Sequence, residues 1–318
     1  MEVRGGSLSR VKALVTGGAG FIASHVVDAL AARGDEVTIV DDLSTGKREN
    51  LTGPGAAAKL VEADIRESRE MRDLIDRVRP HVVFHLAAQI DVRKSTADPA
   101  WDAGINVLGT INLLQASLEA GVDRFVNTST GGAIYGEGRI LPAPEDHPQA
   151  PEAPYGQSKF CAEGYCDLYS RLHGLSTVSL RYGNVYGPRQ DPLGEAGVIA
   201  IFCGKLLADE APTIFGNGEQ TRDYVYVGDV ARANLAAADS RANGAFNVGL
   251  GVQTSVLQRV EALREISGND RFEAEFAPPR LGEVQHIAID PARACGELGW
   301  EPQITLRDGL ERTMASLR

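Results

Sequence analysis

The stretch Thr16-Gly17-Gly18-Ala19-Gly20-Phe21-Ile22-Ala23 directly follows a short apolar run at 12–16 and opens an amphipathic segment. This order of strand, glycine-rich turn and helix is the context that a dinucleotide-binding fingerprint requires. Glycines allow the tight turn and let backbone N–H groups approach a pyrophosphate, whose charge is favoured by the positive end of the helix dipole. We therefore predict a dinucleotide site here. The residues of the turn expected to contact the cofactor are Gly17, Gly20, Phe21 and Ile22.

Beyond this turn the chain alternates short apolar runs with longer amphipathic segments, as repeated βα units do. We predict strands at 12–16, 37–41, 60–63, 81–86, 125–129 and 178–181. We predict helices at 20–33, 67–79, 99–121 and 155–173, several of which end at a glycine, as helices commonly do. The predicted fold class is α/β, with a Rossmann-type doubly wound parallel sheet.

The composition of the sequence changes after residue 182, where glycine and proline become frequent. Irregular loops separate the helices predicted there, near 195–208, 254–267 and 305–318. We predict a dinucleotide-binding Rossmann domain over 11–181, to which the chain returns around 220–250. A smaller C-terminal α/β substrate-binding lobe is expected over 182–318. Asp229 is expected to cap a helix, and residues 1–10 to form a flexible leader.

The composition excludes several classes of protein. With 318 residues, of which 43% are hydrophobic and 24% charged, the chain has the balance of a folded globular protein. A net charge of −11 argues against a nucleic-acid surface, and no run approaches the roughly 20 apolar residues that span a bilayer. Four cysteines without a C-x-x-C pair predict reduced thiols in the cytoplasm. The isolated histidines give no metal site.

Asp41 ends the second predicted strand, 21 residues after Gly20. A carboxylate at about this separation holds the ribose hydroxyls of a dinucleotide, and it repels the 2′-phosphate of NADP. We therefore expect NAD as the cofactor, although Lys47 and Arg48 leave NADP open. Asp64, after the third strand, has two open interpretations: a hydrogen bond to the adenine, or the cap of helix 67–79.

Tyr155 and Lys159 lie four residues apart and therefore share one face of the predicted helix 155–173. A free tyrosine has a pKa of about 10, so a base that works near neutrality needs a shift of roughly 3 units. A lysine ammonium and an oxidised nicotinamide close by could together stabilise the phenolate. Tyr155 and Lys159 are the predicted catalytic pair.

With these residues placed, the chain resembles the extended short-chain dehydrogenase/reductases, and within them the UDP-glucose 4-epimerase group of NAD-dependent epimerases and dehydratases. The resemblance covers nearly all of residues 11–318. The segments that carry it are 16–23, 41–46, 85–89, Asn106, 155–159, 181–188, 222–227 and 246–249.

The resemblance implies an NAD-dependent UDP-hexose 4-epimerase that interconverts UDP-glucose and UDP-galactose through a transient 4-keto sugar. Tyr155 would take the proton from the sugar 4-hydroxyl, and Lys159 would hold the nicotinamide ribose and lower the pKa of Tyr155. Relatives pair through helices equivalent to 99–121 and 155–173, which implies a homodimer. UDP-glucuronate, a UDP-N-acetylhexosamine or a dTDP-sugar stays open as substrate, and so does a non-catalytic NAD-sensing binding protein.

The same resemblance implies further binding residues. For the cofactor they are Asp41, Asp42, Ser44, Thr45, Gly46, Asp64, Ile65, Leu86, Ala87, Ala88, Gln89, Asn106, Tyr155, Lys159 and Tyr182. For the nucleotide sugar they are Asn184, Val198, Phe215, Arg222, Tyr224, Arg280 and Glu283.

One position departs from the family pattern. Such epimerases usually carry a serine or threonine at the place that Gly131 occupies here. We expect Thr130, or else Ser129, to supply the missing hydroxyl. Sugar 4,6-dehydratases carry an Asp-Glu pair after the catalytic threonine, and Gly131 and Gly132 stand at those places. The epimerase interpretation needs the fewest acid and base groups.

Overall fold

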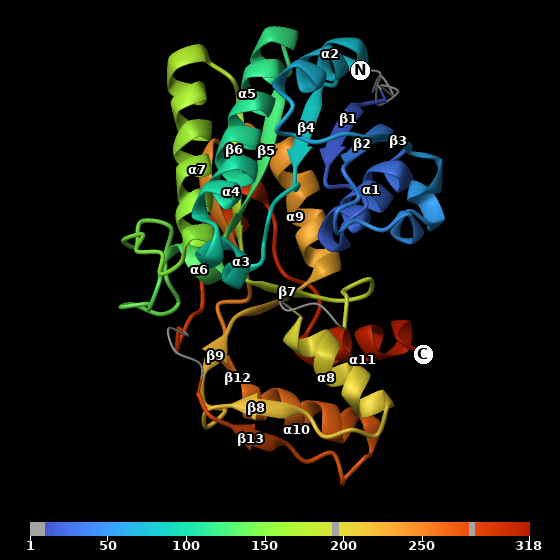
Figure 1. Cartoon of the computed structure of the whole chain (residues 1–318), viewed down its shortest axis with the longest axis vertical. Coiled ribbons are helices and arrows are strands. Elements are labelled where there is room, and N and C mark those ends of the chain that lie inside the picture. Colours follow the sequence, from blue (N-terminus) through green and yellow to red (C-terminus); the bar gives the residue numbers. More distant parts are fainter. Residues whose placement is uncertain (1–9, 193–196, 280–283) are drawn as a thin grey trace, which may run out of the picture.

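The computed structural model describes residues 10–192, 197–279 and 284–318. Its centre is a seven-stranded sheet in the order β11-β6-β5-β4-β1-β2-β3, and every neighbouring pair is parallel (Figure 1). The strands are β1 (Lys12–Thr16), β2 (Glu36–Asp41), β3 (Lys59–Glu62), β4 (Val82–His85), β5 (Arg124–Thr130), β6 (Thr177–Tyr182) and β11 (Gly244–Val248). The strand order reverses between β1 and β4, so a crevice is expected there at the carboxyl ends of the strands.

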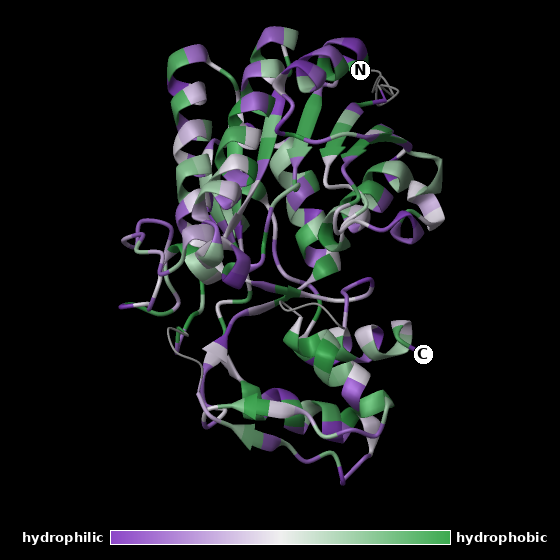
Figure 2. Cartoon of the chain, in the orientation of Figure 1, coloured by the Kyte–Doolittle hydropathy of each residue, from purple (hydrophilic) through white to green (hydrophobic). Residues whose placement is uncertain are grey.

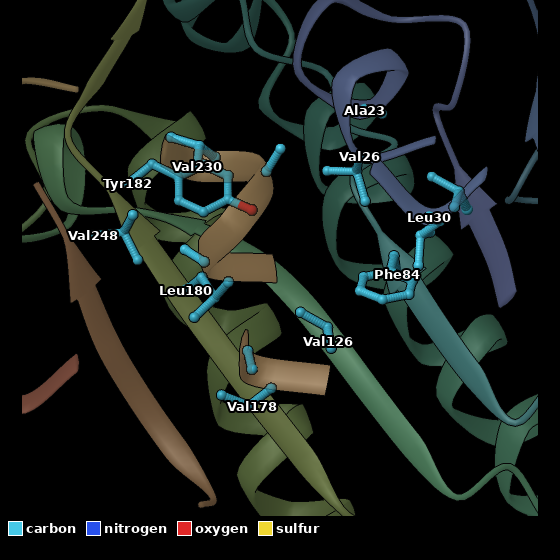
Figure 3. Packing of buried hydrophobic residues seen from close by; sticks show 14 of the residues in the cluster. Ala23, Val26, Leu30, Phe84, Val126, Val178, Leu180, Tyr182, Val230 and Val248 are labelled. Atoms are coloured by element: carbon cyan, nitrogen blue, oxygen red, sulfur yellow. The ribbon is translucent and has the colours of Figure 1, made fainter. Parts of the chain in front are cut away.

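Helices cover both faces of this sheet. On one face α1 (Phe21–Arg33) and α9 (Val227–Asp239) pack side by side against the strands, and Figure 3 shows their side chains meeting Phe84, Val126 and Leu180. On the other face lie α2 (Ser68–Val78), α5 (Gly109–Ala120) and α7 (Pro154–His173). Strands buried on both faces are apolar throughout, which Figure 2 shows as hydrophobic colour along the centre of the sheet.

The connection between β4 and β5 is built from several helical pieces. After α3 (Val92–Ala97), α4 (Pro99–Ala103) runs through a π-helical turn at Gly104–Leu108 directly into α5. The single predicted helix over 99–121 is therefore one helical stretch with a π turn inside it. Such turns are frequent at functional sites. Between β2 and β3 the chain forms short 3₁₀ turns at Arg48–Asn50 and Gly53–Ala57, and α6 (Gly131–Ile134) follows β5.

A second, smaller group of elements lies beyond the carboxyl ends of the strands (lower part of Figure 1). Three two-stranded sheets pair β7 (Asn184–Tyr186) with β10 (Tyr224–Tyr226), β9 (Thr221–Arg222) with β12 (Thr254–Ser255), and β8 (Thr213–Phe215) with β13 (Glu275–Ala277). The helices α8 (Val198–Leu207), α10 (Val256–Ser267) and α11 (Leu306–Ser316) close a separate apolar core. A π-helical turn at Ala294–Leu298 precedes α11.

The six predicted strands are confirmed to within one residue at either end. The seventh, β11, was not predicted, because Gly244 and Asn247 interrupt the apolar pattern of Gly-Ala-Phe-Asn-Val. The prediction that Asp229 caps a helix is wrong, since α9 begins at Val227 with Tyr226 as its N-cap. The buried Asp229 carboxylate instead accepts the N–H groups of Gln303 and Ile304.

Two further observations concern the rest of the chain. Of the predicted leader 1–10, only Arg10 lies within the described residues, and its guanidinium donates to the Gly34 carbonyl. Over the described ranges, no helix is both long and apolar enough to cross a lipid bilayer.

Candidate active site

The backbone of the glycine-rich turn between β1 and α1 lies very close to the backbone at Ala87. Gly17 has a φ of +69°, and a Cβ there would lie 2.7 Å from the Ala87 nitrogen, so only glycine fits. The Gly20 N–H donates to the Gly17 carbonyl at 2.9 Å and tightens the turn. Gly20 is also the N-cap of α1, and no side chain of the described residues caps this helix end. The first-turn N–H groups of α1 can therefore bind a pyrophosphate.

Asp41 joins this turn to the end of β2. Its Oδ2 accepts the Ala19 N–H at 2.9 Å and its Oδ1 accepts the Leu43 N–H at 2.8 Å. Burial raises the pKa of this carboxyl group, while the two backbone N–H groups lower it. A Cβ at Gly46 would lie 2.6 Å from Asp41 Oδ1, so the chain passes close to the carboxylate at that point. Among the described residues each oxygen accepts one N–H, which leaves a lone pair for a contact to ribose hydroxyls.

The neighbouring predicted cofactor residues divide into two groups. Asp42 accepts the N–H and hydroxyl of Ser44 and so fixes the loop after β2. Asp64 forms an ion pair with Arg66, which holds the pKa of that carboxyl below its usual range. The alternative in which Asp64 caps helix 67–79 is wrong, because Glu67 is the N-cap of α2. The contact of Asp64 to adenine stays a prediction.

A column of buried polar groups fixes the loop after β4. Thr16 Oγ1 lies 2.8 Å from His85 Nδ1, and His85 Nε2 lies 2.9 Å from Thr110 Oγ1. The Thr110 hydroxyl donates to the Asn106 carbonyl, so it accepts from His85 Nε2. Burial lowers the pKa of His85 to about 3, and the ring is neutral. Thr16 Oγ1 also accepts the Ala87 N–H at 3.2 Å, which places the predicted segment 86–89 against the glycine-rich turn.

Gln89 and Asn106, both predicted cofactor residues, hydrogen-bond to each other and to a third residue. The Asn106 amide accepts the Gln89 N–H at 3.0 Å and donates to the Gln89 carbonyl at 2.9 Å. Both side-chain amides also donate to Asp102 Oδ1, at 2.9 Å and 3.1 Å. The π turn over 104–108 brings Asn106 to this position.

Tyr155 and Lys159 occupy the first turns of α7, as the spacing predicts. The Tyr155 N–H donates to Ser95 Oγ at 3.2 Å, so α3 anchors the start of the helix. Lys159 Nζ donates to the Thr128 carbonyl at 3.0 Å, close to the end of β5. The Thr130 hydroxyl, two residues farther along, hydrogen-bonds to Tyr155. The structure thus links two of the predicted catalytic residues, Tyr155 and Thr130, and places a third, Lys159, against the same strand, β5.

The pKa of Tyr155 is shifted upward, whereas a tyrosine that acts as a base near neutrality needs a lowered pKa. Burial, with a smaller contribution from the Asp102 charge, raises the pKa of Tyr155 to about 12, against the lowering effect of the Thr130 hydrogen bond. Burial also lowers the pKa of Lys159 to about 8, against the raising effects of Asp102, Cys166 and Glu163. The protein groups alone therefore keep Tyr155 protonated at neutral pH, the opposite direction from the one that a base needs. A positively charged nicotinamide is the remaining group that could stabilise the phenolate.

A side chain at position 131 would press against Ile289. A Cβ at Gly131 would lie 2.6 Å from Ile289 Cδ1 and 2.9 Å from Ile289 Cγ2. A serine at 131 would therefore require Ile289 to move. Of the two predicted substitutes, Thr130 hydrogen-bonds to Tyr155, whereas the buried Ser129 Oγ has no partner among the described residues. The contacts favour Thr130.

The predicted substrate residues lie in the smaller group of elements. Asn184 begins β7, and its buried Oδ1 has no partner within the described part of the chain. Arg222 Nη1 donates to the Thr221 carbonyl at 2.8 Å. Val198 and Phe215 are half-buried, at the start of α8 and the end of β8. Arg280 and Glu283 lie outside the described residues.

Two predicted tyrosines are held by core contacts. The Tyr182 hydroxyl accepts from Asn234 Nδ2 at 2.7 Å and lies 3.2 Å from Thr128 Oγ1, so it links β5, β6 and α9. Tyr224 is buried with its ring under the Arg259 guanidinium, 4.6 Å from the ring centroid. In this structure both side chains serve packing, and their contacts to cofactor and substrate stay predictions.

Residues 13–249 match the protein family described as "NAD dependent epimerase/dehydratase family". The chain belongs to this family. It is 48% identical over 301 residues to a putative UDP-glucose 4-epimerase of Methanocaldococcus jannaschii, covering 95% of this chain and 96% of the relative.

Solved structures agree with this family assignment. The structure of UDP-glucose 4-epimerase from Thermotoga maritima with UDP-glucose superposes with a TM-score of 0.93 at 47% identity, covering 96% of this chain and 98% of the other. The UDP-glucose 4-epimerase of Thermus thermophilus in complex with NAD superposes with a TM-score of 0.89 at 42% identity, covering 96% and 98%. The predicted resemblance and fold class are both confirmed.

For a member of the epimerase/dehydratase family, sequence reasoning missed two residues of the site. Asp102 and Ser95 contact the Tyr155 region or its neighbours, yet both lie more than 50 residues before Tyr155 in the sequence. Asp102 is the one buried residue of α4, whose other side chains are exposed or half-buried, so no hydrophobic pattern in the sequence marks it. Ser95 likewise has no signal in the sequence. Among the described residues no cluster of three or more metal-ligating side chains occurs.

Proposed function

We propose that this chain is an NAD-dependent UDP-hexose 4-epimerase that interconverts UDP-glucose and UDP-galactose. The observation that carries the proposal is the joint position of Tyr155, Lys159 and Thr130 at the carboxyl end of β5. The identity of 47% to an epimerase whose structure holds UDP-glucose supports the choice of sugar.

The residues present fit NAD. The N–H groups at the start of α1 would bind the pyrophosphate, and Asp41 would bind the adenosine ribose, which disfavours a 2′-phosphate. Lys159, with its ammonium group already fixed on the Thr128 carbonyl, would hold the nicotinamide ribose. When bound, NAD supplies a hydride acceptor and donor for C4 of the sugar.

Tyr155 would take the proton from the sugar 4-hydroxyl and later return a proton to the same oxygen. Thr130 would orient that oxygen through its hydrogen bond at Tyr155. Between the two proton transfers the 4-keto sugar turns over and exposes its other face. Asn184, whose side-chain oxygen has no partner within the described part of the chain, and Arg222 would contact the nucleotide diphosphate. Arg280 is proposed for the same role from the family resemblance.

As part of this proposal, the sheet-containing region 11–181, with the returning segment 220–250, binds the cofactor. The region 182–318 mainly binds the nucleotide sugar. A cytoplasmic location fits an enzyme with four unpaired cysteines, Cys161, Cys166, Cys203 and Cys295.

The test is an NMR time course of the purified protein with UDP-galactose and no added NAD. We expect conversion to the C4 epimer, UDP-glucose, because the cofactor is regenerated in each turnover and stays bound. Parallel samples with UDP-glucuronate, UDP-N-acetylglucosamine and a dTDP-hexose identify the sugar. Release of one NADH per turnover would contradict the epimerase mechanism, and a failure to convert any of these substrates after addition of NAD would contradict the proposed activity.

We further propose that the chain forms a homodimer through α5 and α7, which lie side by side at one edge of the molecule (Figure 1). Large apolar side chains are exposed on α7, on α4 and on the π turn that leads into α5. They are Trp101, Leu108, Phe160, Tyr165 and Leu172. Solvent-facing apolar groups gathered in this way are typical of an interface.

We expect Leu108→Glu to convert the dimer to a monomer, because a charge would be buried at the interface. The measurement is the molar mass by light scattering. Leu207→Glu is the matched control, because Leu207 is exposed on α8, away from this surface. A wild-type monomer, or a dimer that survives Leu108→Glu unchanged, would contradict the proposed interface.

A further inference from the structure

Asp102, on α4, is a fully buried carboxylate with a relative exposure of 0%. Its Oδ1 accepts hydrogen bonds from the side-chain amides of Gln89 and Asn106. Its Oδ2 is buried as well and has no hydrogen-bond partner among the described residues. α4 packs against α7, the helix that carries Tyr155 and Lys159.

A buried carboxylate is costly unless a positive charge compensates it. The two amides that bond to Asp102 satisfy one of its oxygens but carry no charge. Lys159 is the cation that interacts electrostatically with Asp102. It has a relative exposure of 3%, and its hydrogen bond to Thr128 is accepted by a neutral carbonyl. Asp102 and Lys159 are thus both buried, on two helices that pack against each other, and Coulomb interactions are stronger there than in water.

The other titratable groups described around Lys159 differ from Asp102, because each is either neutral or already part of an ion pair. On α7, Glu163 lies one turn farther along, but its carboxylate is held by the Arg181 guanidinium at 2.7 Å. Cys166, also on α7, is a buried thiol whose pKa is raised to about 12 by burial, so it is neutral. On β4, His85 is neutral. Asp102 is thus the charged group near Lys159 that no ion pair in the described structure neutralises.

We propose that Asp102 is a positioning residue whose negative charge sets the pH range in which Tyr155 and Lys159 work. The proposal rests on the proposed epimerase function. A negative charge favours the ammonium form of Lys159 and disfavours the phenolate form of Tyr155. Asp102 therefore keeps Lys159 charged at neutral pH and makes phenolate formation at Tyr155 depend on the bound cofactor.

The Asp102 charge shifts the pKa of Lys159 and the pKa of Tyr155 in the same direction, upward. With this charge in place, burial still lowers the pKa of Lys159 to about 8 and raises the pKa of Tyr155 to about 12. Removal of the charge lowers both pKa values. If the rising limb of the pH–rate profile reports Tyr155 and the falling limb Lys159, both limbs move to lower pH together.

The test is Asp102→Asn, in which the amide oxygen can still accept from Gln89 and Asn106. We expect both limbs of the kcat profile to move to lower pH by about one unit, the size typical of a nearby charge. A second readout does not need turnover. The ultraviolet absorbance of phenolate, with Tyr155→Phe as the background, reports the ionisation of Tyr155 directly, and it should also shift to lower pH.

Asp98→Asn is the matched control, because Asp98 lies one turn before Asp102 on the same helix but is exposed. Asparagine still caps α4 at that position, so both limbs should stay where they are. If Asp102→Asn does not fold, Asp102→Ser removes the same charge and should give the same shift.

A reduced rate with unmoved limbs and an unmoved Tyr155 titration would show a purely structural role and overturn the proposal. The two proposals fail separately. If the wild-type protein converts no nucleotide sugar, the epimerase proposal fails, whereas the absorbance titration still decides whether Asp102 acts on Tyr155.

Discussion

Tyr155→Phe is expected to lower kcat by about 100- to 10,000-fold, the range lost with a general acid–base group. Phenylalanine keeps the ring, and the Tyr155 N–H still donates to Ser95, so α7 keeps its first turn. Lys159 keeps its bond to the Thr128 carbonyl. We therefore expect NAD to stay bound and KM to change much less than kcat. The measurements are steady-state epimerase kinetics and the amount of NAD released on denaturation.

Tyr165→Phe is the matched control, since Tyr165 lies on the same helix with its side chain exposed. It should keep wild-type kcat and NAD content. Full activity in Tyr155→Phe would show that another group moves the proton. Loss of NAD together with activity would instead assign Tyr155 to cofactor binding.

The sequence predicted the fold correctly wherever the periodicity of hydrophobic residues and the glycines that end helices indicated the same element. The apolar strands β1, β2 and β4 are buried on both faces, and glycines 34, 121 and 174 in left-handed conformations end α1, α5 and α7. The prediction failed where tertiary contacts decided the outcome. Asp229 looked like a cap, but its carboxylate is engaged by Gln303 and Ile304, more than 70 residues away.

In the site, too, the features set by local sequence could be predicted, and those set by tertiary contacts could not. Tyr155 and Lys159 could be placed from a local spacing, because a helix brings residues four apart to one face. The pKa of Tyr155 could not be predicted from the sequence, because it depends on burial and on Asp102, a residue of another helix. The surroundings of Gly131 were equally hidden, because Ile289, the residue that a side chain at 131 would press against, lies far away in the sequence.

The second large effect is expected at a buried ion pair that joins the sheet to α7. The Arg181 guanidinium, on β6, donates to both carboxylate oxygens of Glu163 at 2.7–3.2 Å. It also donates to the Tyr135 hydroxyl at 2.8 Å and the Glu145 carbonyl at 2.9 Å. Both side chains of the pair are less than a tenth exposed. One arginine thus donates to groups from three separate parts of the chain.

Arg181→Met is expected to lower the free energy of unfolding by about 3–5 kcal/mol, because the Glu163 charge is left buried without a partner. The measurement is denaturant unfolding at neutral pH. The matched control is Arg171→Met, which breaks an exposed pair with Asp167 on the same helix as Glu163. It should cost no more than about 0.5 kcal/mol.

A double variant separates the charge effect from the loss of packing. Glu163→Leu combined with Arg181→Met removes both charges, so it should be more stable than Arg181→Met alone. If the double variant is as unstable as the two single losses added together, the pair contributes through packing and its hydrogen bonds to Tyr135 and Glu145. Stability is the readout to use here, because Glu163 also raises the pKa of Lys159, so that a change in activity alone would not distinguish the two causes.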